Sequence, residues 1–259
     1  MTSYEIFLAI IGGFIAGCIN TLAGNGSVLT LGFLTEIMGM PGNLANGTNR
    51  IGIFIQGLAS LEAFQRNKKI PLKETWHYLV IGIIGAIIGA LVAIRISPDG
   101  FKEVYKYLVL SLLILMIIQS KKWTSKVMFA SGLKPWIYIP VFLALGFYGG
   151  FIQMGMGFFF LAVMVYVAKL PIIEANAVKV LMVTSYTIIV IGIFHVMGYV
   201  DWKIGGTIAL GQGAGGWITA HTVSKIPNAD KVAYYFLIAI MIFTLLHLFG
   251  VFGMLGIHL

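Results

Sequence analysis

Residues 40–50 read MPGNLANGTNR and residues 170–180 read LPIIEANAVKV, so a Pro and, four residues later, an Ala-Asn pair recur at an offset of 130 positions. The tripeptide GGF at residues 12–14 also recurs, at residues 149–151. Further pairs at the offset of 130 are Phe64 with Phe194, Lys73 with Lys203, Gly85 with Gly215 and Ala90 with Ala220. The chain therefore contains an internal repeat.

The composition indicates that this repeat lies in a membrane. The 259 residues are 59% hydrophobic and only 10% charged, whereas soluble domains average about 25% charged residues. Such a composition excludes intrinsic disorder and most soluble enzyme folds. The net charge of +8 comes from basic residues in short loops and not from a basic stripe, which excludes nucleic acid as a partner. We therefore predict an all-α membrane protein, a polytopic helical bundle surrounded by the lipid bilayer.

Ten apolar segments are candidates for membrane helices, because a helix needs about 20 mostly apolar residues to cross a bilayer. They lie at residues 5–23, 27–40, 44–64, 75–96, 105–119, 136–155, 157–169, 173–197, 203–222 and 232–253. The second segment of each half is short and follows a tight Gly-containing turn. The first two segments of each half are therefore either two crossings or a short, re-entrant hairpin, and the sequence leaves both eight and ten crossings open.

The two repeats are predicted to have opposite orientations in the membrane. We assign residues 5–119 to a first transmembrane repeat, 120–135 to a cytoplasmic linker and 136–253 to a second repeat, with about five segments in each repeat. An odd number of crossings in each repeat inverts the second copy, a plan that many secondary transporters share. Most loop Lys and Arg residues then fall on one side, which predicts a multi-pass protein of a bacterial-type cytoplasmic membrane with both termini outside.

Two basic residues, Arg50 and Lys179, are left over once the other Lys and Arg residues are assigned to loops and segment ends. Under the repeat, Lys179 corresponds to Asn49, one position from Arg50, so each half offers a cation at nearly the same depth. Charges inside a membrane are costly and usually face the bundle interior or a water path. Two cations with no nearby acid predict an anion site. The alternative is that both side chains extend to the membrane interface.

Polar side chains accompany both cations. The predicted substrate-binding residues are Arg50, Asn46, Asn49, Thr48, Lys179, Asn176, Asn20, Asn25, Gln153 and Gln56. Asn46, Asn49, Arg50 and Gln56 follow the helical spacing of three and four residues, on one face with Ile53, Gly57 and Ser60. Asn20 and Asn25 belong to a turn before a short helix, where free N–H groups favour anions, and Gln153 occupies the corresponding turn of the second half. The same side chains are compatible with hydrogen bonds that only join helices.

Several other features predict no separate chemistry. Cys18 is the only cysteine, so no internal disulfide and no thiolate metal cluster can form. Glu36 is a candidate proton-coupling residue, and the alternative is a structural position near the membrane interface. His247 and the other histidines near segment ends have no carboxylate partner nearby in the sequence, so we predict no metal and no cofactor. The glycines of residues 211–216 match a dinucleotide fingerprint without a preceding strand, and they predict a close-packing helix face.

The stretches GGFIAGCINTLAGNG at residues 12–26 and MPGNLANGTNR at residues 40–50, with the second copy from Gly149, resemble the TauE/SafE sulfite exporter family, also called the 4-toluene sulfonate uptake permease family. The resemblance covers nearly the whole chain. It implies a multi-pass protein that moves small sulfur-containing anions such as sulfite, sulfoacetate or sulfonates, or other organic anions. Arg50 and the Asn cluster match the first-repeat motif, whereas the second copy has Lys179 and Val180 where the first has Asn49 and Arg50.

These features together predict a secondary transporter and not an enzyme. We expect a small anion to bind between the repeats and to move by alternating access, driven by a proton, by sodium or by its own gradient. An anion channel and a transporter of another small organic anion stay open as alternatives. A homodimer also stays open. On this hypothesis Arg50→Ala abolishes anion binding while the protein stays folded.

Overall fold

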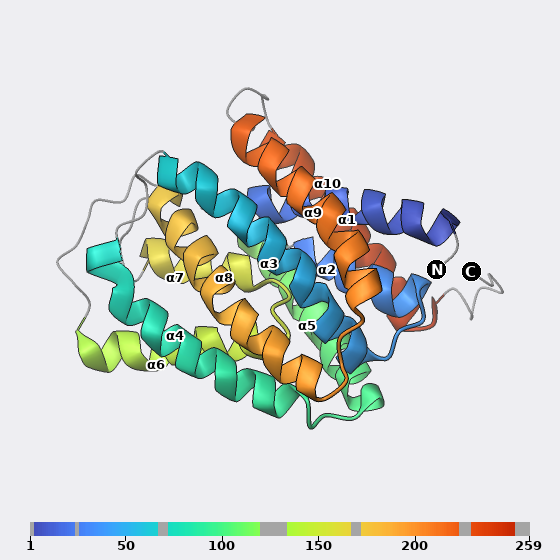
Figure 1. The fold of residues 1–259 in the computed structure, drawn as a ribbon, viewed down its shortest axis with the longest axis horizontal. Helices are drawn as coiled ribbons and strands as arrows, with labels where there is room; N and C mark the ends of the chain where they lie inside the picture. Colours follow the sequence, from blue (N-terminus) through green and yellow to red (C-terminus); the bar gives the residue numbers. More distant parts are fainter. Residues whose placement is uncertain are drawn as a thin grey trace.

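The computed structural model describes residues 3–23, 26–66, 72–119, 134–166, 172–222 and 229–251, and the regular structure in these ranges is helical throughout (Figure 1). The helices are α1 (Ser3–Ala23), α2 (Gly26–Gly32), the π-helical turn η1 (Phe33–Ile37), α3 (Gly42–Arg66), α4 (Leu72–Ala93), α5 (Pro98–Gln119), α6 (Pro135–Phe151), α7 (Met156–Tyr166), α8 (Ile172–Val196), α9 (Trp202–Thr222) and α10 (Ala229–Leu248). Each apolar segment of the sequence thus forms a helix, and the second segment divides into α2 and η1. The prediction of an all-α fold is confirmed.

Local sequence explains where several helices begin and end. The side-chain oxygens of Ser97 and Asp201, which precede α5 and α9, accept hydrogen bonds from the backbone N–H groups of Gly100 (3.1 Å) and Ile204 (2.9 Å). These are N-caps, which satisfy N–H groups that the helix itself leaves free. After α8, Gly198 has a φ of +74°, and two backbone hydrogen bonds close a Schellman turn around it. A short link that ends in a polar cap therefore separates α4 from α5, and a short glycine-containing link separates α8 from α9.

Three of the described helices contain spans that are long and apolar enough to cross a membrane: Ser3–Thr21, Thr75–Ala93 and Glu174–Val196. The second helix of each half is much shorter. The pair α2 and η1 has 7 and 5 residues and α7 has 11, which at about 1.5 Å per residue amounts to no more than about 18 Å, against a hydrocarbon thickness of about 30 Å. These short helices are not long enough to cross a bilayer by themselves.

The two halves of the chain interlock through glycine-lined helix contacts. Along α1 and α9, a Cβ at Gly211 would overlap the carbonyl oxygen of Ile10, and a Cβ at Gly215 would overlap that of Phe14. The residue numbers of the contacting pairs increase in the same direction along both helices, so α1 and α9 run parallel. The predicted close-packing face of residues 211–216 is confirmed, because the backbones approach where only glycine fits.

The second contact repeats this arrangement with the halves exchanged. Here α6 of the second half packs along α4 of the first (Figure 1). A Cβ at Gly146 would overlap the carbonyl oxygen of Gly82, and a Cβ at Gly150 would overlap that of Ala86. In each case the first helix of one half packs against the fourth helix of the other. The two halves therefore share their cores, and neither half forms a core of its own.

The helices α3 and α8 cross the middle of the bundle side by side (Figure 1). Gly47 of α3 packs against Phe194 near the end of α8, and Gly57 packs against Thr184 nearer its start, so the two helices are antiparallel. One buried apolar cluster lies mainly among α1, α2, α5 and α10, and the other lies mainly among α4, α6, α7 and α8. The inversion of one repeat relative to the other stays a prediction.

Candidate functional site

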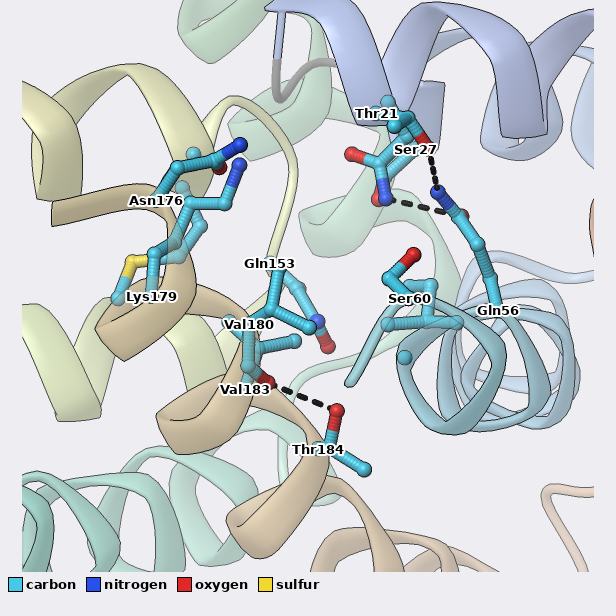
Figure 2. A pocket seen from close by; sticks show the side chains of 15 residues that line it. Thr21, Ser27, Gln56, Ser60, Gln153, Asn176, Lys179, Val180, Val183 and Thr184 are labelled. Atoms are coloured by element: carbon cyan, nitrogen blue, oxygen red, sulfur yellow. Dashed lines mark hydrogen bonds between the residues drawn. The ribbon is translucent and has the colours of Figure 1, made fainter. Parts of the chain in front are cut away.

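A pocket lined by both polar and apolar side chains lies between the two halves, with an empty volume of about 520 Å³ that includes the space at its mouth. Residues of α1, α2 and α3 line one side, and residues of α7, α8 and the link before α7 line the other. Its lining consists of Asn20, Thr21, Ser27, Ile53, Gln56, Gly57, Ser60, Gln153, Met156, Gly157, Asn176, Lys179, Val180, Val183 and Thr184. Figure 2 shows Lys179 and Asn176 on one side, Gln56 and Thr21 on the other, and Gln153 between them.

Lys179 is the cation of this pocket. It belongs to α8, is only 6% exposed, and forms no hydrogen bond or ion pair with another residue of the described ranges. Asn176, one turn earlier on α8, also lines the pocket, and its buried Oδ1 has no hydrogen-bond partner there. None of the described lining residues is acidic. Because a buried unpaired ammonium is costly, this site is electrostatically suited to an anion.

The break between α6 and α7 brings a helix start to the same pocket. After α6 ends at Phe151, Gln153 and Gly155 take positive φ values of 59° and 68°, which turn the chain sharply before α7 begins. Met156 and Gly157, in the first turn of α7, line the pocket together with Gln153. A helix N-terminus carries partial positive charge and free N–H groups, so it adds to the attraction of Lys179 for an anion.

Arg50 lies outside the lining of the pocket and holds the end of α6 (its side chain is 0% exposed). Its Nη1 donates hydrogen bonds to the carbonyl oxygen of Gly149 (2.5 Å) and to Oε1 of Gln153, and its Nη2 donates to the carbonyl of Gly150 (2.9 Å). The ring of Phe194 lies 5.8 Å from the guanidinium carbon. A cation at a helix C-terminus satisfies terminal carbonyl groups and complements the helix dipole, so Arg50 acts here as a C-cap supplied by α3.

Asn46 completes this cap. Its Nδ2 donates to the carbonyl of Phe151 (2.7 Å), while its Oδ1 accepts from Nη2 of Arg50 (3.2 Å). Two other polar residues of α3, Asn49 and Thr48, bind α2 and the link before α9. Asn49 accepts a hydrogen bond from Thr30 Oγ1 (2.6 Å), and Thr48 Oγ1 accepts from the backbone N–H of Asp201 (2.9 Å). The polar start of α3 therefore joins α2, α6 and the link before α9.

Two further predicted residues line the pocket from the first half. Asn20 of α1 donates from Nδ2 to Oε1 of Gln56 on α3 (3.0 Å). Gln56 in turn donates from Nε2 to the carbonyl of Gly17 (3.1 Å) and to Thr21 Oγ1 (3.0 Å). This network uses both ends of the Gln56 amide to hold α1 against α3, and it forms a fixed polar wall of the pocket.

The structure thus divides the predicted set by position. The pocket brings together Asn20, Gln56, Gln153, Asn176 and Lys179. Arg50, Asn46, Asn49 and Thr48 lie outside its lining, and Asn25 lies outside the described residues. The role of each as an anion ligand stays a prediction.

The predicted set did not include several residues of the lining. Ser27, Thr21, Ser60 and Thr184 contribute hydroxyl groups, and Ile53, Val180 and Val183 form apolar wall. The helical spacing along α3 provided a signal for Ser60. The same spacing includes Ile53, whereas Val180 and Val183 carry no signal that distinguishes them from core residues.

One histidine has a carboxylate partner that the local sequence does not reveal. The local sequence predicts no carboxylate partner for His247 of α10, but its Nε2 lies 2.8 Å from Oε2 of Glu36 in η1. The two residues are far apart in the sequence, so local spacing could not reveal the pair. The contact joins α10 to η1 and lies outside the residues that line the pocket.

The comparisons with known proteins agree with this architecture. The chain is 30% identical over 204 residues to the probable membrane transporter protein ORF9 of a Sinorhizobium species. The matched region covers 78% of this chain and 77% of the relative. It is 27% identical over 220 residues to a probable membrane transporter protein of Haemophilus influenzae, covering 82% of each chain. No solved structure matches the chain.

A family match extends over nearly the entire bundle. The model of the family described as sulfite exporter TauE/SafE matches residues 9–248, from α1 to the end of α10. Apolar helices and this family match together make the protein a membrane-embedded transporter. The chain belongs to the sulfite exporter TauE/SafE family.

Proposed function

We propose that this protein is a secondary transporter that carries a small anion across the cytoplasmic membrane, and that Lys179 binds the anion. The observation that carries the proposal is the buried ammonium of Lys179 in a pocket whose described lining contains no acid. A bound anion would pair with this charge, whereas a bound cation would meet an uncompensated positive charge. The family membership supports transport of the substrate without its chemical conversion.

The pocket also favours a particular size and charge of substrate. One cation, the first turn of α7 and the amides of Gln153 and Asn176 form a polar end, while Ile53 and Val183 contribute apolar surface. This combination fits a single oxyanion group on a small apolar body better than a polyanion. An alkyl sulfonate has this character, hydrogen sulfite has the single charge without the apolar body, and the family description supports a sulfur-containing substrate. A small carboxylate has the same charge and is the second class that we would test.

Alternating access is the proposed mechanism, because the pocket lies where the two halves meet. Movement of α6, α7 and α8 relative to α1, α2 and α3 would open the pocket first to one side and then to the other. The inverted repeat, the multi-pass topology and the placement of both termini outside belong to this proposal. Energy would come from a proton or sodium gradient, or from the gradient of the anion itself.

Counterflow in proteoliposomes tests the proposal. Vesicles that contain the purified protein are loaded with unlabelled methanesulfonate or sulfite, and uptake of the same labelled anion is followed from outside. We expect the internal load to accelerate the uptake of label, since a carrier returns faster when it is occupied, and we expect Lys179→Met to remove this acceleration. Uptake that is unaffected by the internal anion would indicate a channel, and the absence of uptake for sulfur anions and carboxylates would contradict anion transport.

The same vesicles test energy coupling. An imposed proton gradient and an imposed sodium gradient are compared with no gradient, each with the membrane potential held constant. We expect one of the two gradients to drive accumulation of the anion if transport is coupled. Equal uptake in all three conditions would show that the anion moves down its own gradient only.

A further inference from the structure

We propose that Arg50 is a positioning residue that orients the amide of Gln153 so that its nitrogen donates a hydrogen bond to the anion. This inference rests on the proposed function, because it assumes that an anion occupies the pocket. It assigns a role to the buried arginine that is different from direct contact with the substrate. The observation behind it is that Gln153 touches Arg50 with one atom and lines the pocket as well.

The contact with Arg50 determines the direction of the Gln153 amide. A guanidinium group has N–H donors and no acceptor, so only the amide oxygen of a glutamine can accept its hydrogen bond. Oε1 of Gln153 therefore faces Nη1 of Arg50. The other end of the same amide, Nε2, must point away from the guanidinium. Because Gln153 is 4% exposed and lines the pocket, this orientation presents an N–H donor and not an oxygen to the bound molecule.

The side chain of Arg50 is held in place by several hydrogen bonds. Both of its terminal nitrogens are used, by the carbonyl groups of Gly149 and Gly150, by Gln153 and by Asn46. Nε of Arg50 has no hydrogen-bond partner in the described residues. The side chain is 0% exposed, so its two terminal nitrogens could reach a ligand only by giving up these bonds. A group held in this way is suited to fix its neighbour. Its bidentate fork, which lysine lacks, is what holds the carbonyl groups and Gln153 together.

The backbone of Gln153 is held in place by the cap on α6. Its φ of +59° is in the left-handed region, which is uncommon for a residue with a side chain. The carbonyl groups of the three residues that end α6, from Gly149 to Phe151, are held by Arg50 and Asn46. The cap on α6 therefore fixes the chain immediately before Gln153, and the hydrogen bond to Oε1 fixes its side chain.

Affinity for methanesulfonate tests the inference, measured by titration of the purified, detergent-solubilised protein. Its neutral analogue dimethyl sulfone serves as the ligand control. The first variant, Gln153→Met, keeps the approximate length of the side chain and removes the N–H donor. We expect it to lower the affinity about tenfold or more, since a hydrogen bond to a charged group is lost. A Gln153→Met protein that folds and binds methanesulfonate as tightly as the parent overturns the inference.

The second arm asks whether Arg50 acts through Gln153. Arg50→Lys keeps the charge and removes the fork, and it is measured both in the parent and in the Gln153→Met background, as a double-mutant cycle. We expect a loss of affinity of about threefold or more in the parent and of less than about twofold in the Gln153→Met background. Equal losses in both backgrounds would show that Arg50 acts independently of Gln153, and no loss in either would show that the fork is not needed; both results overturn the inference. If Arg50→Lys does not fold, the Gln153→Met result decides.

Failure of this inference can be told apart from failure of the proposed function. The parent and Lys179→Met are titrated first. Binding by the parent that is lost in Lys179→Met, together with unchanged binding in Gln153→Met, leaves the anion site in place and removes only the positioning role. If the parent binds neither methanesulfonate, sulfite nor acetate, the anion function itself is contradicted and the inference falls with it.

Discussion

Nη2 of Arg50 on α3 donates a hydrogen bond of 2.9 Å to the carbonyl oxygen of Gly150, in the last turn of α6. The bond joins the first half of the chain to the second at a point where α6 ends and the link to α7 begins. A charged residue of one half thus completes the backbone hydrogen bonding of the other. This relationship changes what is expected of substitutions at Arg50.

Arg50→Ala is now expected to destabilise the fold. The substitution leaves the carbonyl groups of Gly149 and Gly150 without their partner, and each buried unsatisfied group costs about 1–3 kcal/mol. A lower thermal melting temperature in detergent would therefore accompany any loss of anion binding. The matched control is Lys102→Ala, which removes one positive charge from an exposed position on α5 and should leave the melting temperature nearly unchanged. Equal melting temperatures for parent and Arg50→Ala would contradict the capping role.

Gly215→Ala tests the close contact between α1 and α9. The added Cβ would overlap the carbonyl oxygen of Phe14, so the helices must move apart at a cost of about 1–3 kcal/mol. Gly206→Ala is the control on the same helix, because a Cβ there meets nothing within 4 Å. We expect a clear fall in melting temperature for Gly215→Ala and none for Gly206→Ala. The account of the glycine face is wrong if the two variants melt alike.

Thr48→Val and Thr48→Ser separate a hydrogen bond from side-chain shape. Thr48 Oγ1 accepts a 2.9 Å hydrogen bond from the backbone N–H of Asp201 and is fully buried. Valine keeps the shape but leaves that N–H unsatisfied, which predicts a loss of about 1–3 kcal/mol. Serine keeps the hydroxyl and should retain most of the stability. Thermal unfolding of both variants checks the order, and a valine variant as stable as the parent would show that the bond contributes nothing.

The helices could be predicted from the sequence because their signals are local. Apolar segments, the short second segment of each half and the glycine pattern of residues 211–216 all depend on neighbouring residues, and the structure has helices in each place. The start of α6 at Pro135 lies one residue before the predicted segment, whereas α5, capped by Ser97, begins at Pro98, seven residues before the predicted 105.

The arrangement of the site could be predicted only in part. The sequence identified Arg50 and Lys179 as costly charges that need a partner, and either an anion or a helix C-terminus satisfies that need. Which one applies depends on tertiary packing: α6 ends opposite Arg50, whereas Lys179 faces the pocket. The pair of Glu36 and His247 was missed for the same reason, since only the packing of α10 on η1 brings the two together.

The measurement that tests the central claim most directly is the thermal stability of the parent and of Lys179→Met, with and without added anions. The panel contains methanesulfonate, sulfite, sulfate, acetate and taurine, with dimethyl sulfone as the neutral control. A ligand that binds only the folded state stabilises it by about 2.7 kcal/mol at 100 times its dissociation constant. We expect at least one monoanion to raise the melting temperature of the parent, and the same anion to have no effect on Lys179→Met. An equal rise in both proteins would contradict the role of Lys179, and a parent that responds to no anion would contradict the anion site.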